Sequence, residues 1–180
     1  ICPAGYYCVG GEKFECPAGS LGEAGGLWNP TCDGQCPRGY YCVGGEKHEC
    51  GSVDKYCPAG SSAPTNVTTG HYSGPSDVNE NVRYEETLCP VGYYCVGGEK
   101  FECASGYFGN STGLTTSQCS GMCKDGYYCE SGSTRDDQHE CGSVDKYCPA
   151  GSETPLVVPD GYYSGPEDAS ETTRSEKTIC

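Results

Sequence analysis

Cysteine is the residue type with the greatest capacity for chemistry in this sequence. The chain has 17 Cys among 180 residues, and thiols form disulfides, bind zinc or act as nucleophiles. Structural zinc sites favour C-x2-C pairs, whereas intervals of five, seven, fifteen and three residues separate the first five cysteines. A nucleophile needs an unpaired, activated thiol, but these cysteines follow one periodic framework. We therefore expect disulfides. The predicted disulfide cysteines are Cys2, Cys8, Cys16, Cys32, Cys36, Cys42, Cys50, Cys57, Cys89, Cys95, Cys103, Cys119, Cys123, Cys129, Cys141, Cys148 and Cys180.

Histidines and carboxylates are the other candidates for chemistry. His48 and His139 each precede a glutamate, as a ligand or base would, but His48 fills the position of Phe14 in a repeated segment. A flat ring lying on a hairpin is therefore the expected role. No Asp/Asn loop ends in the Glu that calcium-binding hands require, so we expect solvated charge, with weak calcium bridging as a minor alternative. Tyr rings and Trp28 could stack on sugars, although packing beside disulfides is preferred. We predict no catalytic residue, metal site or cofactor.

Two segments carry the chemistry of an N-glycosylation acceptor. Asn66-Val-Thr and Asn110-Ser-Thr are intact sequons, whereas Asn29 is followed by Pro and is disqualified. Both acceptors lie in polar, turn-rich stretches. The Ser, Thr and Pro content of residues 61–69 also suits O-linked sugar. We predict N-linked glycans at Asn66 and Asn110, with O-linked glycans as a further expectation.

The composition indicates a cross-linked scaffold in place of an aliphatic core. The chain contains 28 Gly, 12 Pro and 15 Tyr but only 5 Leu and 2 Ile. A Cys content above ~8% is typical of secreted disulfide scaffolds, because cross-links replace burial that the sequence cannot supply. We therefore predict an oxidising compartment and an extracellular location, either secreted or at the cell surface.

Charge and hydropathy exclude some classes of partner. A net charge of −14 and a pI near 4.4 argue against nucleic acid, which requires clustered Lys and Arg. No apolar run approaches the roughly 20 residues that cross a bilayer, and no leader-like segment precedes Ile1. We expect no nucleic-acid partner, no membrane span in this sequence, and a position inside a longer secreted protein.

Internal repetition is the strongest organisational signal. The segment GYYCVGGEKFEC at residues 5–16 recurs unchanged at residues 92–103 and with one change at residues 39–50. Six cysteines recur after 87 residues and three after 91, because four residues are inserted between Cys129 and Cys141. We predict repeat 1 at residues 2–88, with halves 2–35 and 36–88, and repeat 2 at residues 89–179, with halves 89–122 and 123–179, while Cys180 begins a third repeat.

Each half is expected to begin with a β-hairpin. In CPAGYYC, Pro sets a turn and Gly5 accepts a positive φ. Tyr6 and Tyr7 then enter a strand whose side chains alternate between two faces, Val-Gly-Gly forms a tight turn, and Glu-Lys-Phe-Glu returns. No stretch shows sustained 3.6-residue apolar periodicity, and Gly or Pro interrupts almost every window. The predicted fold class is a small disulfide-rich β protein: a tandem, elongated array of cysteine-stapled hairpin modules with little or no helix.

The segment CPVGYYCVGGEKFECASGYFGNSTGLTTSQCSGMCKDGYYC carries a family resemblance. It resembles the GCC-type ephrin-receptor-like cysteine-rich repeats, which are distant relatives in style of tumour-necrosis-factor-receptor modules. The CPAGS motif followed by GYYSGP at residues 161–166 supports the resemblance, whereas residues 20–31 depart from it. The resemblance covers nearly the whole chain and implies an elongated, extracellular series of disulfide-pinned β modules. It implies no particular ligand.

The cysteine connectivity stays open at this point. Eight cysteines permit 105 pairings, and two schemes fit the spacing. The preferred scheme interleaves bonds within each half, whereas the alternative staples neighbouring repeats. The preferred pairs in repeat 1 are Cys2–Cys16, Cys8–Cys32, Cys36–Cys50 and Cys42–Cys57, and the alternative pairs are Cys16–Cys32, Cys57–Cys89 and Cys148–Cys180.

Near-verbatim repetition favours a structural function, because a specific binding site normally requires one repeat to differ. Trp28 and the insertion within residues 131–138 are the singular features. We predict that the chain is not an enzyme but a structural extracellular repeat protein that forms or contributes to a glycosylated fibril, stalk or surface coat. Its partners would be neighbouring repeats of the same chain or copies of itself, in an extended array whose repeats contact mainly their neighbours. The alternative is the ligand-binding or adhesion ectodomain of a cell-surface receptor.

Overall fold

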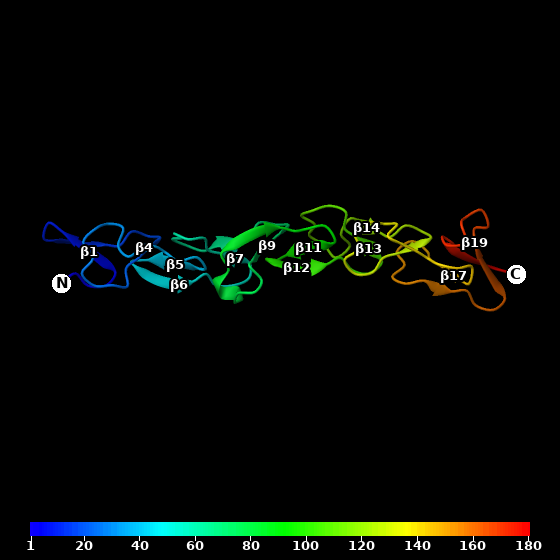
Figure 1. Ribbon diagram of the computed structural model, residues 1–180, viewed down its shortest axis with the longest axis horizontal. Coiled ribbons are helices and arrows are strands. Elements are labelled where there is room, and N and C mark those ends of the chain that lie inside the picture. The colour runs from blue at the N-terminus through cyan, green and yellow to red at the C-terminus, as the bar shows by residue number, and fades with distance from the viewer. The chain divides into compact units, whose positions relative to one another are not determined.

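A computed structural model describes residues 1–180 as a succession of short strands joined by turns (Figure 1). The strands pair into ten two-stranded sheets, and the only helical segment is the 3-10 turn η1 (Glu80–Val82). The prediction of a small disulfide-rich β fold with little or no helix is confirmed. The first five pairs are β1 (Tyr6–Val9) with β2 (Glu12–Glu15), β3 (Ser20–Leu21) with β4 (Gly34–Gln35), β5 (Tyr40–Val43) with β6 (Glu46–Glu49), β7 (Lys55–Tyr56) with β8 (Thr65–Asn66), and β9 (His71–Gly74) with β10 (Glu85–Leu88). The next five pairs are β11 (Tyr93–Val96) with β12 (Glu99–Glu102), β13 (Tyr107–Phe108) with β14 (Gly121–Met122), β15 (Tyr127–Tyr128) with β16 (His139–Glu140), β17 (Lys146–Tyr147) with β18 (Leu156–Val157), and β19 (Tyr162–Gly165) with β20 (Glu176–Ile179).

The β1–β2 hairpin shows why GYYCVGGEKFEC folds as it does. Its two-residue turn places both glycines at positive φ, +60° and +84°, which is the conformation that a tight hairpin turn of this hand requires. Tyr7 lies opposite Phe14 and stacks on it at 5.4 Å. Nζ of Lys13 lies 4.2 Å from the centre of the Tyr6 ring. The two tyrosines therefore use opposite faces of the strand, as the alternation predicts.

Cystine sulfur takes the place of an aliphatic core. All the buried hydrophobic residues are cysteines, and only three polar residues, Ser73, Ser133 and Ser164, are buried beside them. Large apolar side chains such as Val9 and Val96 are each 54% exposed. Each closed loop restricts the unfolded chain and contributes ~2–3 kcal/mol in the chain-entropy model. The cross-links thus supply the stability that an aliphatic core supplies in larger proteins.

The disulfide connectivity corrects both schemes. The preferred interleaved pairs, Cys2–Cys16 and Cys8–Cys32 among them, are wrong, because the turn after Cys2 folds that residue back onto Cys8, 5.7 Å away between Cα atoms. The alternative is right for Cys16–Cys32 and wrong for the two bonds that would have joined repeats. The bonds are Cys2–Cys8, Cys16–Cys32, Cys36–Cys42, Cys50–Cys57, Cys89–Cys95, Cys103–Cys119, Cys123–Cys129 and Cys141–Cys148.

No disulfide joins the two strands of one hairpin. The bonds close sequence separations of 6, 7 or 16 residues. Cys180 was predicted among the disulfide cysteines, but it is an exposed free thiol. It holds the repeat position of Cys2 and Cys89, whose partners are the cysteines six residues further along.

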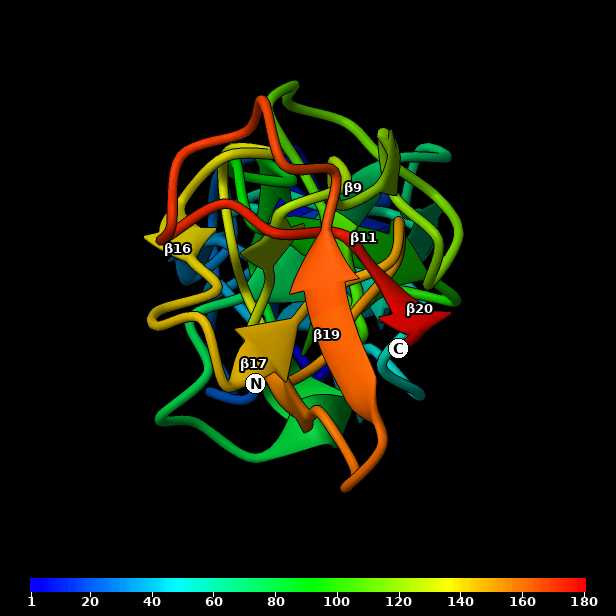
Figure 2. The same ribbon diagram turned by 90° about the vertical axis from the view of Figure 1, so that its right-hand side faces the viewer.

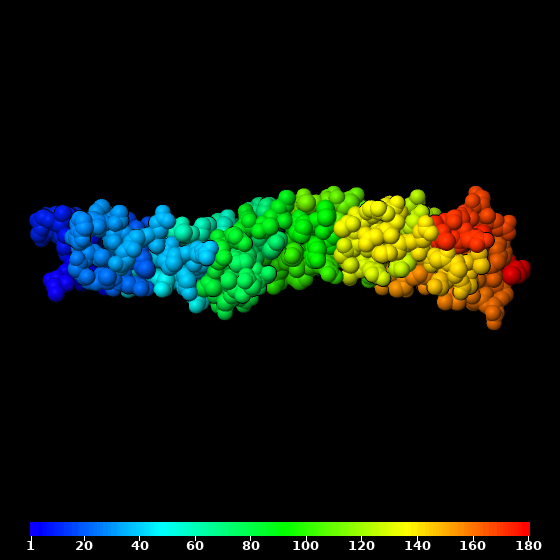
Figure 3. All heavy atoms as spheres, in the orientation of Figure 1, coloured from blue at the N-terminus to red at the C-terminus, as the bar shows by residue number.

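Contacts divide the chain into two compact units. Unit 1 comprises residues 1–87 together with 97–99, and unit 2 comprises residues 88–96 and 100–180. Within each unit, consecutive segments follow one another as bands of colour (Figure 3). The extended form expected for the whole array stays a prediction, as do the predicted repeat boundaries.

Candidate functional site

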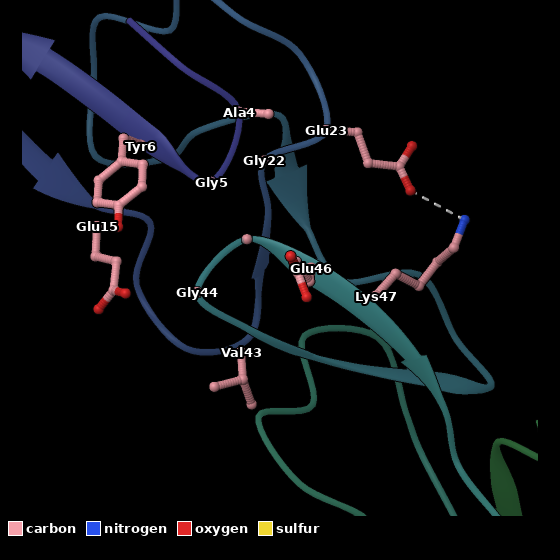
Figure 4. A pocket seen from close by; sticks show the side chains of 11 residues that line it. Ala4, Gly5, Tyr6, Glu15, Gly22, Glu23, Val43, Gly44, Glu46 and Lys47 are labelled. Carbon is pink, nitrogen blue, oxygen red and sulfur yellow. Dashed lines mark ion pairs between the residues drawn. The ribbon is translucent and has the colours of Figure 1, made fainter.

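Each hairpin contacts the next through backbone hydrogen bonds. In unit 1, the amide of Gly5 donates to the carbonyl of Gly22 at 2.7 Å, and the amide of Gly22 donates to the carbonyl of Gly45 at 2.9 Å. Gly45 also forms a parallel bridge with Leu21. Figure 4 shows Gly5, Gly22 and Gly44 converging at this point. A row of main-chain bonds therefore links three segments that are far apart in the sequence. We call such a meeting of segments a stacking contact.

The glycine of CPAGYYC is required by the stacking contact as well as by the turn. Gly5 has φ +81°, and a Cβ there would lie 2.7 Å from the carbonyl oxygen of Gly44. No side chain fits at that distance without moving backbone. Close approach and left-handed backbone thus select the same residue.

Unit 2 repeats this geometry. The amide of Gly92 donates to the carbonyl of Gly109 at 2.8 Å, and the amide of Gly109 donates to the carbonyl of Ser133 at 2.9 Å. A Cβ on Gly92 would lie 2.5 Å from the carbonyl oxygen of Gly132. The stacking contact is therefore present in both units, although the partner turn in unit 2 has a different sequence.

Beside the stacking contact of unit 1 lies an open hollow of about 710 Å³. Its rim carries three carboxylates, those of Glu15, Glu23 and Glu46, and one amine, that of Lys47. Lys47 pairs with Glu23 at 3.3 Å, and both side chains are solvent-exposed (Figure 4). The Tyr6 ring, two aliphatic side chains and the main chain complete the lining. The hollow is an open seam between modules.

A second stacking contact involves the Cys-free arms, and the sequence reading missed it. The main-chain carbonyl of Arg83 accepts a hydrogen bond from the amide of Cys57 at 2.9 Å. Nη1 of the Arg83 side chain donates to the carbonyl of Ser73 at 2.5 Å. In unit 2, the main-chain carbonyl of Arg174 accepts a hydrogen bond from the amide of Cys148 at 2.9 Å, and Nη1 of Arg174 donates to the carbonyl of Ser164 at 3.2 Å. The recurrence of these residues after 91 positions is the signal that could have found them.

A third stacking contact seats a hairpin turn on strand β9. The amide of Ser73 donates to the carbonyl of Gly98 at 3.0 Å, and Gly98 forms a parallel bridge with Tyr72. Oγ of Ser73 donates to the carbonyl of Val53. A Cβ on Gly98 would lie 2.1 Å from that same carbonyl oxygen. All these residues belong to unit 1, and the Val-Gly-Gly sequence is what permits the approach.

The two glycan acceptors are accessible. Asn66 ends the short strand β8 and is exposed, and Asn110 is exposed in the loop after β13. Thr68, the third residue of the first sequon, donates its amide and hydroxyl to the carboxylate of Glu86 at 2.7 and 3.0 Å. Neither acceptor takes part in a stacking contact, so a glycan on either would project into solvent.

The remaining candidates have structural positions. His48 stacks on Tyr41 at 5.1 Å, and His139 stacks on Tyr128 at 5.1 Å, so the expectation of a flat ring on the hairpin is confirmed. Trp28 is 74% exposed. The Ser143 hydroxyl donates to the Asp145 carboxylate and holds its pKa below the ordinary value. The arrangement as a whole can hold modules in register.

No family model matches the chain, and no curated protein is significantly similar to it. The eight disulfides are typical of an extracellular or secreted protein. Its only helical segment, η1, is three residues long and could not span a membrane.

Proposed function

We propose that this chain is a structural extracellular repeat protein that forms or contributes to a glycosylated fibril, stalk or surface coat. The observation that supports this most strongly is the recurrence of one stacking contact in both units, with glycine amides at equivalent repeat positions donating to backbone carbonyls. A contact made of backbone atoms and glycines can be reused without limit, because it does not depend on particular side chains. Resemblance to the GCC-type ephrin-receptor-like repeats supports the extracellular part of the proposal.

The alternative is a ligand-binding or adhesion ectodomain of a receptor. Such a protein would use one module that differs from the rest, and Trp28, which is exposed in unit 1 and has Thr115 at its repeat position, is the observation in favour. A single exposed ring without an enclosing pocket is weaker support than a contact repeated in both units. The structural role is therefore the better-supported proposal.

Antibodies raised against the folded chain test the proposal on the source cells. Gold-labelled electron microscopy should decorate extracellular filaments or a coat at regular intervals, and the antigen should remain in the detergent-insoluble fraction. Peptide mapping of the same material should find glycans at Asn66 and Asn110 and none at Asn29. Labelling confined to the plasma membrane, with full extraction by detergent, would favour the receptor alternative.

A further inference from the structure

The first sequon is held in the folded chain by a carboxylate from a distant strand. The amide and hydroxyl of Thr68 donate to the two carboxylate oxygens of Glu86, at 2.7 and 3.0 Å. Glu86 is half-buried on β10, which pairs with β9 in the arm of unit 1. Hydrogen bonds to an ionised carboxylate are stronger than those between neutral groups. We call these two hydrogen bonds the Thr68 clamp.

The first two residues of this sequon are also engaged by the fold. Asn66 is exposed, but its backbone belongs to the β7–β8 pair, in which it lies opposite Lys55. The amide of Val67 donates to the carbonyl of Asp54 at 2.8 Å. Together with the Thr68 clamp, these contacts fix all three residues of the sequon in the folded arm.

The second sequon has no equivalent of the clamp. Asn110 is exposed in the loop after β13, and its amide donates to Oγ of Ser120 at 3.1 Å. The Ser111 hydroxyl donates to Oδ1 of Asn110 at 3.1 Å, and this bond leaves the side-chain nitrogen of Asn110 unengaged. Thr112 is exposed, and no hydrogen bond of the fold engages its amide or its hydroxyl. The third residue of this sequon is therefore accessible while the chain is folded.

The arm folds in unit 2 without the clamp. Val157, Pro159 and Lys177 hold the repeat positions of the acceptor, the clamped threonine and the carboxylate. Strands β17, β19 and β20 nevertheless adjoin one another (Figure 2), and β17 pairs with β18 as β7 does with β8. The acceptor and its clamp thus occur together in one repeat and are replaced together in the other. The clamp accompanies the sequon, and the fold of the arm does not require it.

The chemistry of the transfer shows what the clamp withholds. N-glycosylation forms a bond between the side-chain nitrogen of Asn and the anomeric carbon of an oligosaccharide held on a lipid diphosphate. The bond from that carbon to the phosphate oxygen breaks, the lipid diphosphate leaves, and the nitrogen releases one proton. The requirement for Ser or Thr two residues after Asn indicates that the transferase contacts this hydroxyl. In the folded arm, the hydroxyl of Thr68 already donates to Glu86.

We propose that Asn66 accepts its glycan only while the arm of unit 1 is unfolded, whereas Asn110 remains an acceptor after folding. Glu86 follows Thr68 by 18 residues, so during synthesis the sequon emerges before the strand that clamps it. Folding of β10 then closes the first site and leaves the second open. The inference rests on the proposed glycosylated role and states when each of its two glycans is added.

Transfer to the folded, unglycosylated chain tests the proposal. The chain is made without a transferase and oxidised until peptide mapping finds all eight disulfides. It is then incubated with a purified oligosaccharyltransferase and a lipid-diphosphate-linked oligosaccharide, and the reduced and alkylated chain is the unfolded reference. Folding should slow the initial rate at Asn66 about tenfold or more and the rate at Asn110 less than about threefold.

Two substitutions on β10 separate the clamp from the strand that carries it. Glu86→Ala and Glu85→Ala each remove one carboxylate, but only the first removes the clamp. Folded Glu86→Ala should accept a glycan at Asn66 about fivefold faster than the folded parent chain or more, whereas Glu85→Ala should match the parent. Glu86→Lys, which introduces the residue of unit 2, should behave like Glu86→Ala. Unchanged hydrogen exchange of the Cys57 amide, which donates to Arg83, shows that the arm stays folded.

A folded chain that accepts glycans at Asn66 and Asn110 equally well, relative to the unfolded reference, would overturn the proposal. So would loss of transfer at both sites on folding, because Asn110 would then be closed as well. Glu86→Ala and Glu86→Lys chains as slow at Asn66 as their parent would show that the clamp does not close the site. The labelling test of the structural role is independent, because it maps glycans on native material and both sites are open before folding.

Discussion

The turn between β5 and β6 in unit 1 and the turn between β15 and β16 in unit 2 make the same stacking contact, although their sequences differ. In unit 1, Val-Gly-Gly-Glu at residues 43–46 forms a two-residue turn, and the carbonyl of Gly45 accepts the amide of Gly22 at 2.9 Å. In unit 2, the chain at residues 130–138 carries four more residues, yet the carbonyl of Ser133 accepts the amide of Gly109 at the same 2.9 Å. The position of one carbonyl oxygen is retained while the side chains and the length of the loop change.

The longer turn of unit 2 compensates with side-chain hydrogen bonds. Ser133 is 1% exposed and donates its hydroxyl to the carbonyl of Glu130 at 2.7 Å. The amide of Thr134 donates to Oε1 of Gln138 at 2.8 Å. Strands β15 and β16 are two residues long, against four for β5 and β6. Unit 2 has therefore exchanged ladder hydrogen bonds for polar contacts within the loop, and stability at this turn now depends on particular side chains.

The largest expected effect is the loss of stability on removal of a disulfide, and it should be the same in both units. Replacing both members of the Cys16–Cys32 bond by Ser should lower local stability by ~3 kcal/mol, because the chain-entropy contribution depends on loop length. Replacing both members of Cys103–Cys119 should have the same effect, since the separation is again 16 residues. Hydrogen exchange read by mass spectrometry gives the local free energy in each unit. A difference above ~1 kcal/mol between the units would show that strain, not loop length, sets the value.

The next effect concerns the glycines at the stacking contacts. Gly5→Ala and Gly92→Ala should each destabilise their unit by ~2 kcal/mol more than Gly10→Ala and Gly97→Ala. All four positions have positive φ and share the backbone penalty, but only the first two would place a Cβ against a carbonyl oxygen. Denaturant unfolding with the disulfides intact measures the difference. Equal losses at all four positions would mean that backbone conformation alone selects glycine.

Much of the fold could have been foreseen from residue types, whereas the disulfide connectivity and the stacking contacts could not. The hairpins, their turns and the opposite faces of Tyr6 and Tyr7 follow from local rules, because φ preference and strand alternation act over a few residues. The predicted disulfide pairing was wrong at Cys2 and Cys8, because the three-dimensional path of a Pro-Gly turn decides which sulfurs meet. The glycine stacking contacts were out of reach for a related reason: they join backbone groups, which every residue carries, so no side-chain pattern marks them. The contact at Arg83 and Arg174 differs, because the recurrence of these residues could have indicated it.

A smaller effect separates the units at the turn itself. Ser133→Ala should destabilise unit 2 by ~1 kcal/mol, because it removes a buried hydroxyl that donates to Glu130. Ser131→Ala, at an exposed position in the same loop, is the matched control and should change stability by less than ~0.5 kcal/mol. Exchange of the Gly109 amide, which donates to the Ser133 carbonyl, reports the effect directly. An unchanged exchange rate in Ser133→Ala would mean that the backbone alone holds the carbonyl in place.

The smallest effect lies in the charge at the seam, where the two units again diverge. Lys47 pairs with Glu23 in unit 1, whereas Asn110 holds the repeat position of Glu23 in unit 2. Both partners of the pair are substantially exposed, so solvent screens them and Glu23→Gln should lower stability by no more than ~0.5 kcal/mol. A double-mutant cycle with Lys47→Gln isolates the coupling, which should vanish near 1 M salt because screening there acts within about 3 Å. A coupling that survives at that ionic strength would mean that the pair is sheltered and that ionic contacts, as well as backbone, set the register of unit 1. Loss of the coupling in salt would leave the glycine and carbonyl contacts as the common determinant of both units.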